Sequence, residues 1–292
     1  HVATAVWGYA SAAAMLVSAI AGAALGAISD HLGRRKPILI ALVVIGSVAT
    51  ALMALVPAGD WRALLVLFVF AFVPFAAANV LYDSLLTSVA APDELDRVSA
   101  RGFAWGYIGG GVLLAINLAW IAMPGRFGLS GVEAATRLSF ASVGVWWLAF
   151  SIPLFRRVPE GSGARPAGAA PPGVVLRGAV RDLAHTLSRA RHHPDLFRFL
   201  VAYWLYSDGI GTIVRMSSIY GSELGIGRAH LVGALLMVQI VAAPASVAFG
   251  ALARRIGGKR AIILGLLGYA AIPVYAFFIS RPRDFWILAG MV

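Results

Sequence analysis

Two charged residues, Asp208 and Arg215, interrupt the apolar stretch 196–220. Seven residues of α-helix make about two turns and rise about 10.5 Å, so the two side chains would share one face. A carboxylate and a guanidinium at that separation could bind the two ends of a zwitterion, or could form a proton site with a counter-charge. Other polar side chains that could contribute are Tyr203, Tyr206 and Thr212 on the same stretch, and Asn79 and Asn117 on two others.

Asp208 also has a purely structural interpretation. In that case its carboxylate caps or braces a neighbouring helix, and Gly209 and Gly211 only interrupt their own helix. The sequence leaves both interpretations open.

A second group of charges lies between two apolar stretches, at residues 26–38, which read GAISDHLGRRKPI. Asp30 precedes Arg34 and Arg35 in this segment. A carboxylate at the end of a helix can accept hydrogen bonds from the N terminus of another helix, where unpaired N–H groups and the positive end of the dipole favour an anion. Asp30 is placed for such a contact.

The composition is that of an integral membrane protein. Mean hydropathy is +0.83, and 13% of residues are charged, against roughly 25% in ordinary soluble domains. A membrane span requires about 20 apolar residues. Eight stretches approach or exceed this length: residues 8–29, 37–57, 63–89, 99–122, 134–155, 196–220, 229–252 and 261–279.

Both ends of the sequence favour a fragment of a longer chain. A ninth apolar run begins near Asp284 and stops at Val292, too early to span a bilayer. The sequence begins with His1 rather than Met, shortly before a complete apolar stretch. We therefore expect further helices outside these residues.

The distribution of Lys and Arg residues among the loops predicts how the spans are oriented in the membrane. Most of the 24 Lys and Arg residues fall in alternate loops, at residues 34–36, 97–101, 156–198 and 254–260. Cytoplasmic loops carry such an excess, so these loops are expected in the cytoplasm. The net charge of +11 therefore reflects topology and does not indicate nucleic-acid binding. Membrane lipids are the expected surroundings.

A polar segment divides the spans into two groups. We expect an N-terminal helical bundle at residues 1–155, a cytoplasmic linker at 156–195 and a C-terminal bundle at 196–292. Residues 156–173 are rich in Pro, Gly and Ala, as in a flexible linker. Apolar residues then recur every three or four positions among arginines, which predicts an amphipathic helix, either on an anionic membrane surface or free in solution.

The segment 26–38 has a weaker copy at 250–260, GALARRIGGKR. Gly26 and Gly33 are seven residues apart in the first copy, and Gly250 and Gly257 are seven apart in the second. Cations follow the second glycine in both. Each copy joins an inward-running helix to the next one, as expected for two homologous halves of a transporter.

Gly26, Asp30, Gly33, Arg34 and Arg35 match the loop signature G-x-x-x-D-x-x-G-R-[RK] of the major facilitator superfamily, which this chain resembles. The stretches LYDSLL (81–86), RVSARGFAWGYIGGG (97–111) and FLVAYWLYSDGIGTI (199–213) resemble the branch of vacuolar, autophagy-related amino-acid effluxers of fungi and their bacterial relatives. This resemblance implies an all-α polytopic membrane protein of two six-helix bundles, of which the chain would hold helices two to nine and the start of the tenth. It also implies transport by alternating access, and a bacterial inner membrane as the location.

The resemblance further implies a cytoplasmic gate. In the superfamily the signature Asp meets the eleventh helix, and the first Arg reaches an acid on the fourth, which would be Asp83 here. An ionised acid inside a bilayer costs about 2.5–3.5 kcal/mol on insertion scales, so Asp83 should be paired, with Arg34 as the obvious partner. We expect Gly26, Asp30, Gly33, Arg34, Arg35 and Asp83 to hold the cytoplasmic side shut in the outward-facing state.

Small residues recur every four positions on two stretches. Ala14, Ser18, Gly22 and Gly26 form one row, and Gly102, Gly106 and Gly110 form another. Such rows let helix backbones approach closely. They are either ordinary packing surfaces or, by the resemblance, surfaces that move during alternating access.

The leading interpretation is a secondary active transporter of a small polar solute, with amino acids as the class that the resemblance implies and a proton as a candidate coupling ion. The alternative is a transporter-like membrane sensor or scaffold without flux, whose basic cytoplasmic segment binds a partner or lipid headgroups. An enzyme is not expected, because the sequence has no metal-ligand motif, no Ser with an intramembrane His and no paired catalytic carboxylates. No cofactor or metal is expected, and the absence of Cys excludes thiol chemistry within these residues.

Overall fold

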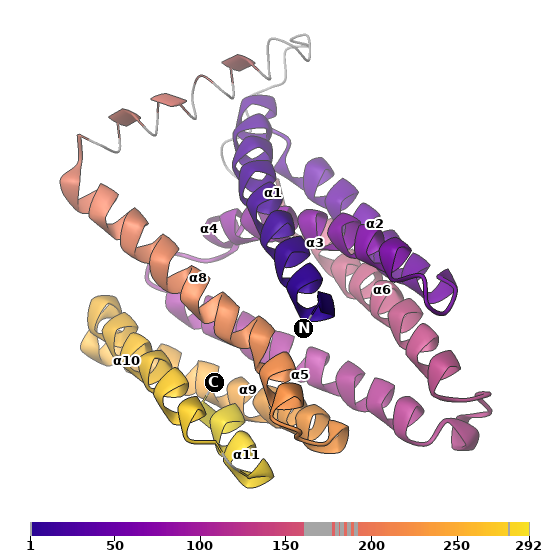
Figure 1. The fold of residues 1–292 in the computed structure, drawn as a ribbon. Coiled ribbons are helices and arrows are strands. Elements are labelled where there is room, and N and C mark those ends of the chain that lie inside the picture. Colours follow the sequence, from indigo (N-terminus) through magenta and orange to yellow (C-terminus); the bar gives the residue numbers. More distant parts are fainter. Residues whose placement is uncertain are drawn as a thin grey trace. The chain divides into compact units, whose positions relative to one another are not determined.

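The computed structural model describes residues 2–160, 177–178, 181, 184–185, 188–189, 192–279 and 281–291. Every regular element in this part of the chain is a helix (Figure 1). The first half contains α1 (Val2–Leu32), α2 (Arg35–Leu52), η1 (Met53–Leu55), α3 (Trp61–Ser84), α4 (Leu86–Val89), α5 (Leu95–Ala122), η2 (Pro124–Phe127) and α6 (Val132–Arg157). The second half contains α8 (Pro194–Glu223), α9 (Arg228–Ile256), α10 (Gly258–Phe277) and α11 (Pro282–Met291).

Seven helical segments are long and apolar enough to cross a membrane, in the part of the chain that is described. They correspond to seven of the eight predicted spans, and the all-helical membrane fold is confirmed. The eighth prediction, residues 196–220, forms the 30-residue helix α8. This helix is not among the seven, because Asp208, Arg215 and its tyrosines lower its mean hydropathy. The predicted short run at the end of the sequence is α11.

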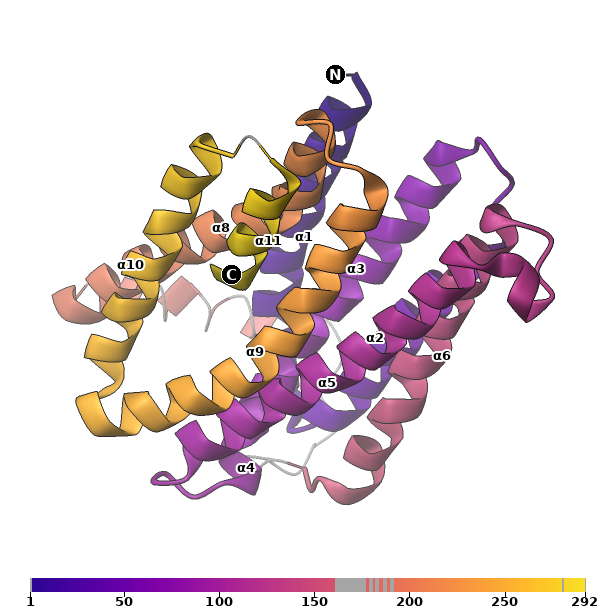
Figure 2. The same ribbon diagram turned by 90° about the horizontal axis from the view of Figure 1, so that it is seen from below.

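The second glycine of each copy of the loop motif has a positive φ. Gly33 follows α1 with a φ of 60°, and Gly257 separates α9 from α10 with a φ of 84°. Both values lie in the left-handed region, which glycine adopts without the steric cost of a Cβ atom. The second glycine of each copy therefore makes the corner between two helices, and Figure 2 shows that corner between α9 and α10.

The chain divides into two compact units. Unit 1 comprises His1–Pro92 and Trp120–His192, and unit 2 comprises Asp93–Ala119 and His193–Val292. Most of α5 thus groups with the later helices, whereas the sequence prediction placed all of residues 1–155 in one bundle. The division into bundles at residues 1–155 and 196–292 stays a prediction. Most of the predicted linker lies outside the described residues; in its amphipathic segment only residues 177–178, 181, 184–185 and 188–189 are described, and they are helical.

Unit 1 is built around α2, which packs against α3 on one side and α6 on the other (Figure 1). Its core includes Leu39 and Val43 of α2 with Leu81 of α3, all at most 4% exposed. Gly144 of α6 allows a close approach of the two backbones, because a Cβ atom there would lie 2.5 Å from the carbonyl oxygen of Ser47. A small residue is therefore required where α6 crosses α2.

Unit 2 has its core among α9, α10 and α11. The buried side chains there are Ile226, Ala234, Ile272, Ile279, Phe285, Leu288 and Ala289. Residues of α5 approach α9 through glycine: a Cβ atom on Gly250 would lie 2.6 Å from Ala100, and one on Gly110 would lie 3.2 Å from the amide nitrogen of Gln239. These close approaches are two of the points at which residues 93–119 meet this unit.

Candidate functional site

The signature loop is closed by an ion pair between Asp30 and Arg35. The Nη2 and Nε atoms of Arg35 both donate to Oδ1 of Asp30, at 2.7 and 2.9 Å. The pair bridges the last turn of α1 and the first residue of α2, across the corner at Gly33. Asp30 therefore pairs within its own loop, and its predicted contact with a helix N terminus stays a prediction.

Arg34 and Asp83 are both exposed. Arg34 occupies the position before α2 and makes no side-chain capping bond there. Among the described residues, neither side chain has an ion-pair partner within 4.0 Å. The predicted Arg34–Asp83 pair is thus not formed in this structure, and its formation in another state stays a prediction.

Lys36 makes two contacts that the sequence did not predict. Its backbone N–H donates to Oε1 of Glu160 at 2.8 Å, and its Nζ donates to the carbonyl oxygen of Val158 at 2.6 Å. Glu160 and Val158 follow the end of α6, at a sequence separation of 124 and 122 residues. No spacing rule links positions so far apart, so only the packing of α6 on α2 could reveal them.

Asp83 shares a face of α3 with Asn79. The two residues are one helical turn apart, and both are exposed. Ala77, Ala78 and Leu81, all at most 4% exposed, form the side of α3 that packs within unit 1. Asn79 and Asp83 therefore lie on the side of α3 that its own unit leaves uncovered.

On α8, Asp208 lies opposite the face that packs in unit 2. That packed face carries Ile213, which contacts the core, and Tyr220, whose hydroxyl donates to the carbonyl oxygen of Ala276 at 2.9 Å. At 100° per residue, Asp208 is about 140° from Ile213 around the helix. Asp208 and Thr212 are both exposed. The position of Arg215 is on the same face, but its side chain lies outside the described part of the structure.

The structure separates the predicted tyrosines from Asp208. Tyr206 is two residues from Asp208, which places the side chains about 200° apart. The ring of Tyr206 instead meets that of Tyr203, with centroids 5.3 Å apart, and Tyr203 lies 6.3 Å from Phe199. These three rings form a row on the other side of α8. Only Asp208, Thr212 and the Arg215 position are brought together.

The remaining predicted residues have different surroundings. Asn117 is 8% exposed and is engaged in an interaction. Gly22 packs within unit 1, since a Cβ atom there would lie 3.2 Å from Cγ2 of Val80 on α3. A Cβ atom on Gly26, Gly102 or Gly106 would meet nothing within 4 Å. The first row of small residues is therefore partly a packing surface, and a role of either row in movement stays a prediction.

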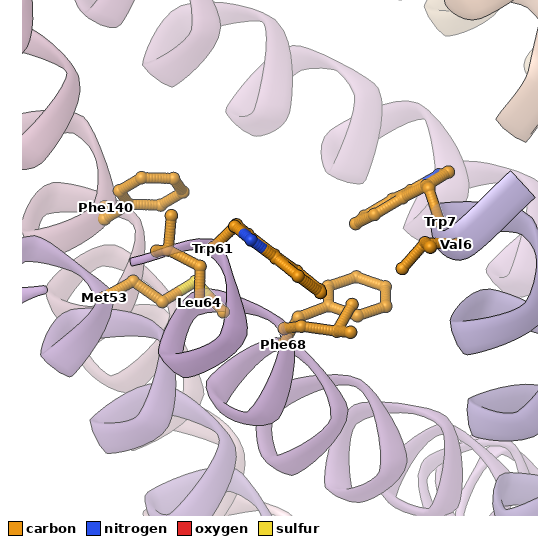
Figure 3. A pocket seen from close by; sticks show the side chains of 8 residues that line it. Val6, Trp7, Met53, Trp61, Leu64, Phe68 and Phe140 are labelled. Atoms are coloured by element: carbon orange, nitrogen blue, oxygen red, sulfur yellow. The ribbon is translucent and has the colours of Figure 1, made fainter. Parts of the chain in front are cut away.

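A cavity of about 650 Å³ lies in unit 1, between the starts of α1 and α3, η1 and α6 (Figure 3). Its lining is apolar and largely aromatic, and the rings of Trp7 and Phe68 lie 4.7 Å apart. The lining residues are Val6, Trp7, Met53, Trp61, Leu64, Leu65, Phe68 and Phe140. None of the polar residues predicted to bind a solute is among them. The cavity does not suit a charged solute, because a charge there would lack a polar partner.

Within the described residues, no three His, Asp or Glu side chains come together as a metal site would require. The chemistry that this part of the chain presents is therefore that of separate polar faces on otherwise apolar helices.

Comparison with known proteins identifies the family. Residues 2–291 match the protein family described as vacuole effluxer Atg22 like. The chain belongs to this family. The predicted resemblance to the vacuolar effluxer branch is confirmed.

Relatives of this Atg22-like chain occur in bacteria and fungi. It is 38% identical over 290 residues to the uncharacterized MFS-type transporter YxiO of Bacillus subtilis. The aligned region covers 99% of the chain and 67% of YxiO. It is 32% identical over 210 residues to autophagy-related protein 22-2 of Aspergillus clavatus, covering 65% of the chain and 32% of that protein. Autophagy-related protein 22 of Yarrowia lipolytica is 28% identical over 223 residues, covering 66% of the chain and 36% of the relative.

The chain thus spans two-thirds of YxiO and roughly a third of these fungal proteins. No solved structure matches the Atg22-like chain. Family membership and the apolar helices together make it a multi-pass membrane protein of a transporter family.

Proposed function

We propose that the protein is a secondary active transporter that moves a small polar solute across the membrane by alternating access. The observation that supports this most directly is the position of Asp208, on the face of α8 opposite the one packed in unit 2. A carboxylate in a membrane helix is costly in lipid and is normally paired, or faces water or a ligand. The face of Asp208 and Thr212 is therefore proposed to line the path of the solute.

Amino acids are the proposed solute class. The spacing of Asp208 and Arg215 suits a molecule with an amino group at one end and a carboxylate at the other. The resemblance to vacuolar amino-acid effluxers favours the same class. Asp208 is also the proposed site of a coupling proton, because a carboxylate on this face can bind and release one.

The signature loop is proposed to close the cytoplasmic side. Asp30 and Arg35 hold the loop together, which leaves Arg34 available to pair with Asp83 on α3 when the gate shuts. The exposed face of Asn79 and Asp83 is consistent with a second role for Asp83 along the solute path. The bacterial relative favours an inner-membrane location.

Asp208→Asn tests the proposal. In proteoliposomes with the full-length protein, we expect amino-acid flux to fall by about ten-fold or more, because a hydrogen bond to a charged group contributes about 1.5–3 kcal/mol. Asp195→Asn is the matched control, since Asp195 begins the same helix, is 97% exposed and pairs only with Arg198 among the described residues. The control should retain flux within about two-fold, as for ordinary exposed sites. Full flux in Asp208→Asn would remove Asp208 from the path.

A further inference from the structure

The three cations of the signature loop have three different surroundings. Arg35 pairs with Asp30 in the loop itself. Lys36 contacts Val158 and Glu160, which follow α6. Arg34 is exposed and has no ion-pair partner among the described residues. Two of the cations are thus held in place, and the third projects from a loop that they fix.

Glu160 supplies the cap that α2 lacks. The first backbone N–H groups of a helix have no partner within the helix, and Lys36 is the second residue of α2. The residue before the helix, Arg34, makes no side-chain cap. Oε1 of Glu160 accepts the Lys36 N–H at 2.8 Å instead. A carboxylate suits this position because the helix dipole is positive there.

Lys36 completes a reciprocal contact. Its Nζ donates to the carbonyl oxygen of Val158 at 2.6 Å, just after the last turn of α6. The last carbonyl groups of a helix lack internal partners, and a Lys side chain commonly satisfies them. The start of α2 and the end of α6 therefore satisfy each other, through two bonds that both involve Lys36.

We propose that Glu160 and Lys36 fasten the first residues after α6 to the signature loop, and that Glu160 is a positioning residue that holds Arg34 where it can pair with Asp83. The proposal rests on the proposed transport function for its second half only, since the fastening itself can be measured without transport. Gly33 precedes Arg34 with a φ of 60°, so the backbone at Arg34 is defined by that corner on one side and the capped helix on the other.

The fastening is tested by hydrogen–deuterium exchange on a peptide covering residues 33–40 of the full-length protein. Glu160→Ala should speed exchange of the Lys36 amide by about five-fold, the size expected for a lost helix cap. Glu160→Gln keeps an oxygen acceptor and should restore most of the protection. Arg157→Ala is the matched control, since Arg157 is an exposed neighbour with no interaction partner among the described residues, and it should leave exchange unchanged. Equal exchange in Glu160→Ala and the wild type would overturn the proposal.

The positioning role is tested by turnover and KM in proteoliposomes. Glu160→Ala should lower turnover by about five-fold with little change in KM, and should have no further effect when Arg34→Ala is already present. A purely structural role of Glu160 would make the losses of turnover in the two variants additive. Faster exchange of the Lys36 amide with normal turnover would show that the contact forms but does not position Arg34. Either result overturns the proposal. No flux in the wild-type protein would instead contradict the proposed function, while the exchange result would still decide the fastening.

Discussion

Asp208 and Tyr206 are two positions apart in the sequence and lie on opposite sides of α8. Both are polar and near the middle of one apolar stretch, so the sequence alone favours grouping them. Helical geometry and the packed face of Ile213 and Tyr220 separate them. Asp208 and Thr212, by contrast, are one turn apart and both exposed. The residues proposed to act together on a solute are therefore those on the uncovered face.

This separation gives a prediction at the residue scale. Thr212→Val and Tyr206→Phe each remove one hydroxyl from α8, on opposite faces. We expect Thr212→Val to lower kcat/KM by roughly two- to ten-fold, the range for one neutral hydrogen bond of about 0.5–1.5 kcal/mol. Tyr206→Phe should stay within about two-fold of the wild type. The reverse order in a flux assay would place the solute on the tyrosine side.

The signature loop itself is predictable from the sequence, but the partners of its residues are not. The match of Asp30, Arg34 and Arg35 to a loop between two helices was found from the sequence alone, because the motif is local. The partner of Lys36 was not, because Glu160 is 124 residues away and nothing in its own neighbourhood marks it as a cap. The pairing of Asp30 with Arg35 rather than with another helix also depends on the geometry of the Gly33 corner.

At the scale of elements, the helices use glycine in two ways. Gly144 is fixed by packing, because a Cβ atom placed there would lie 2.5 Å from the backbone of α2. Gly106 on α5 has nothing within 4 Å of its Cβ position. The first glycine is needed for the fold of unit 1, and the second is not needed by any contact described.

The two glycines should therefore respond differently to alanine. Gly144→Ala should destabilise the protein by about 1–3 kcal/mol, the usual cost of overpacking, and lower the melting temperature of the purified protein. Gly106→Ala should leave that temperature unchanged or slightly raised, because alanine favours helix. If α5 moves against another surface during transport, Gly106→Ala will lower turnover all the same. Unchanged turnover would assign Gly106 no part in movement.

Helix boundaries were predicted better than helix partners. The apolar stretches and the cations between them placed seven spans and the two loop motifs. The grouping of residues 93–119 with the later helices was not foreseen, because it depends on close approaches such as that of Gly250 to Ala100. The position of α8 among the spans is also not decided by composition, since the same charged residues that suggest function lower its hydropathy.

In the molecule as a whole, the family membership and the uncovered polar faces favour the same function. An Atg22-like chain with YxiO as a relative presents Asp208 on α8 and Asn79 with Asp83 on α3, each on a side its own unit does not cover. Polar faces of this kind are expected where a transporter exposes a site to one side of the membrane and then to the other. We propose on these grounds that a solute crosses the membrane through this protein.

Exchange of labelled amino acid across proteoliposome membranes, without any ion gradient, shows whether a solute crosses. The full-length protein should exchange internal unlabelled amino acid for external label well above protein-free liposomes, because a site that faces each side in turn allows exchange at equilibrium. Label that binds to the purified protein but never enters the liposomes, for every amino acid offered, would contradict transport and favour a sensor.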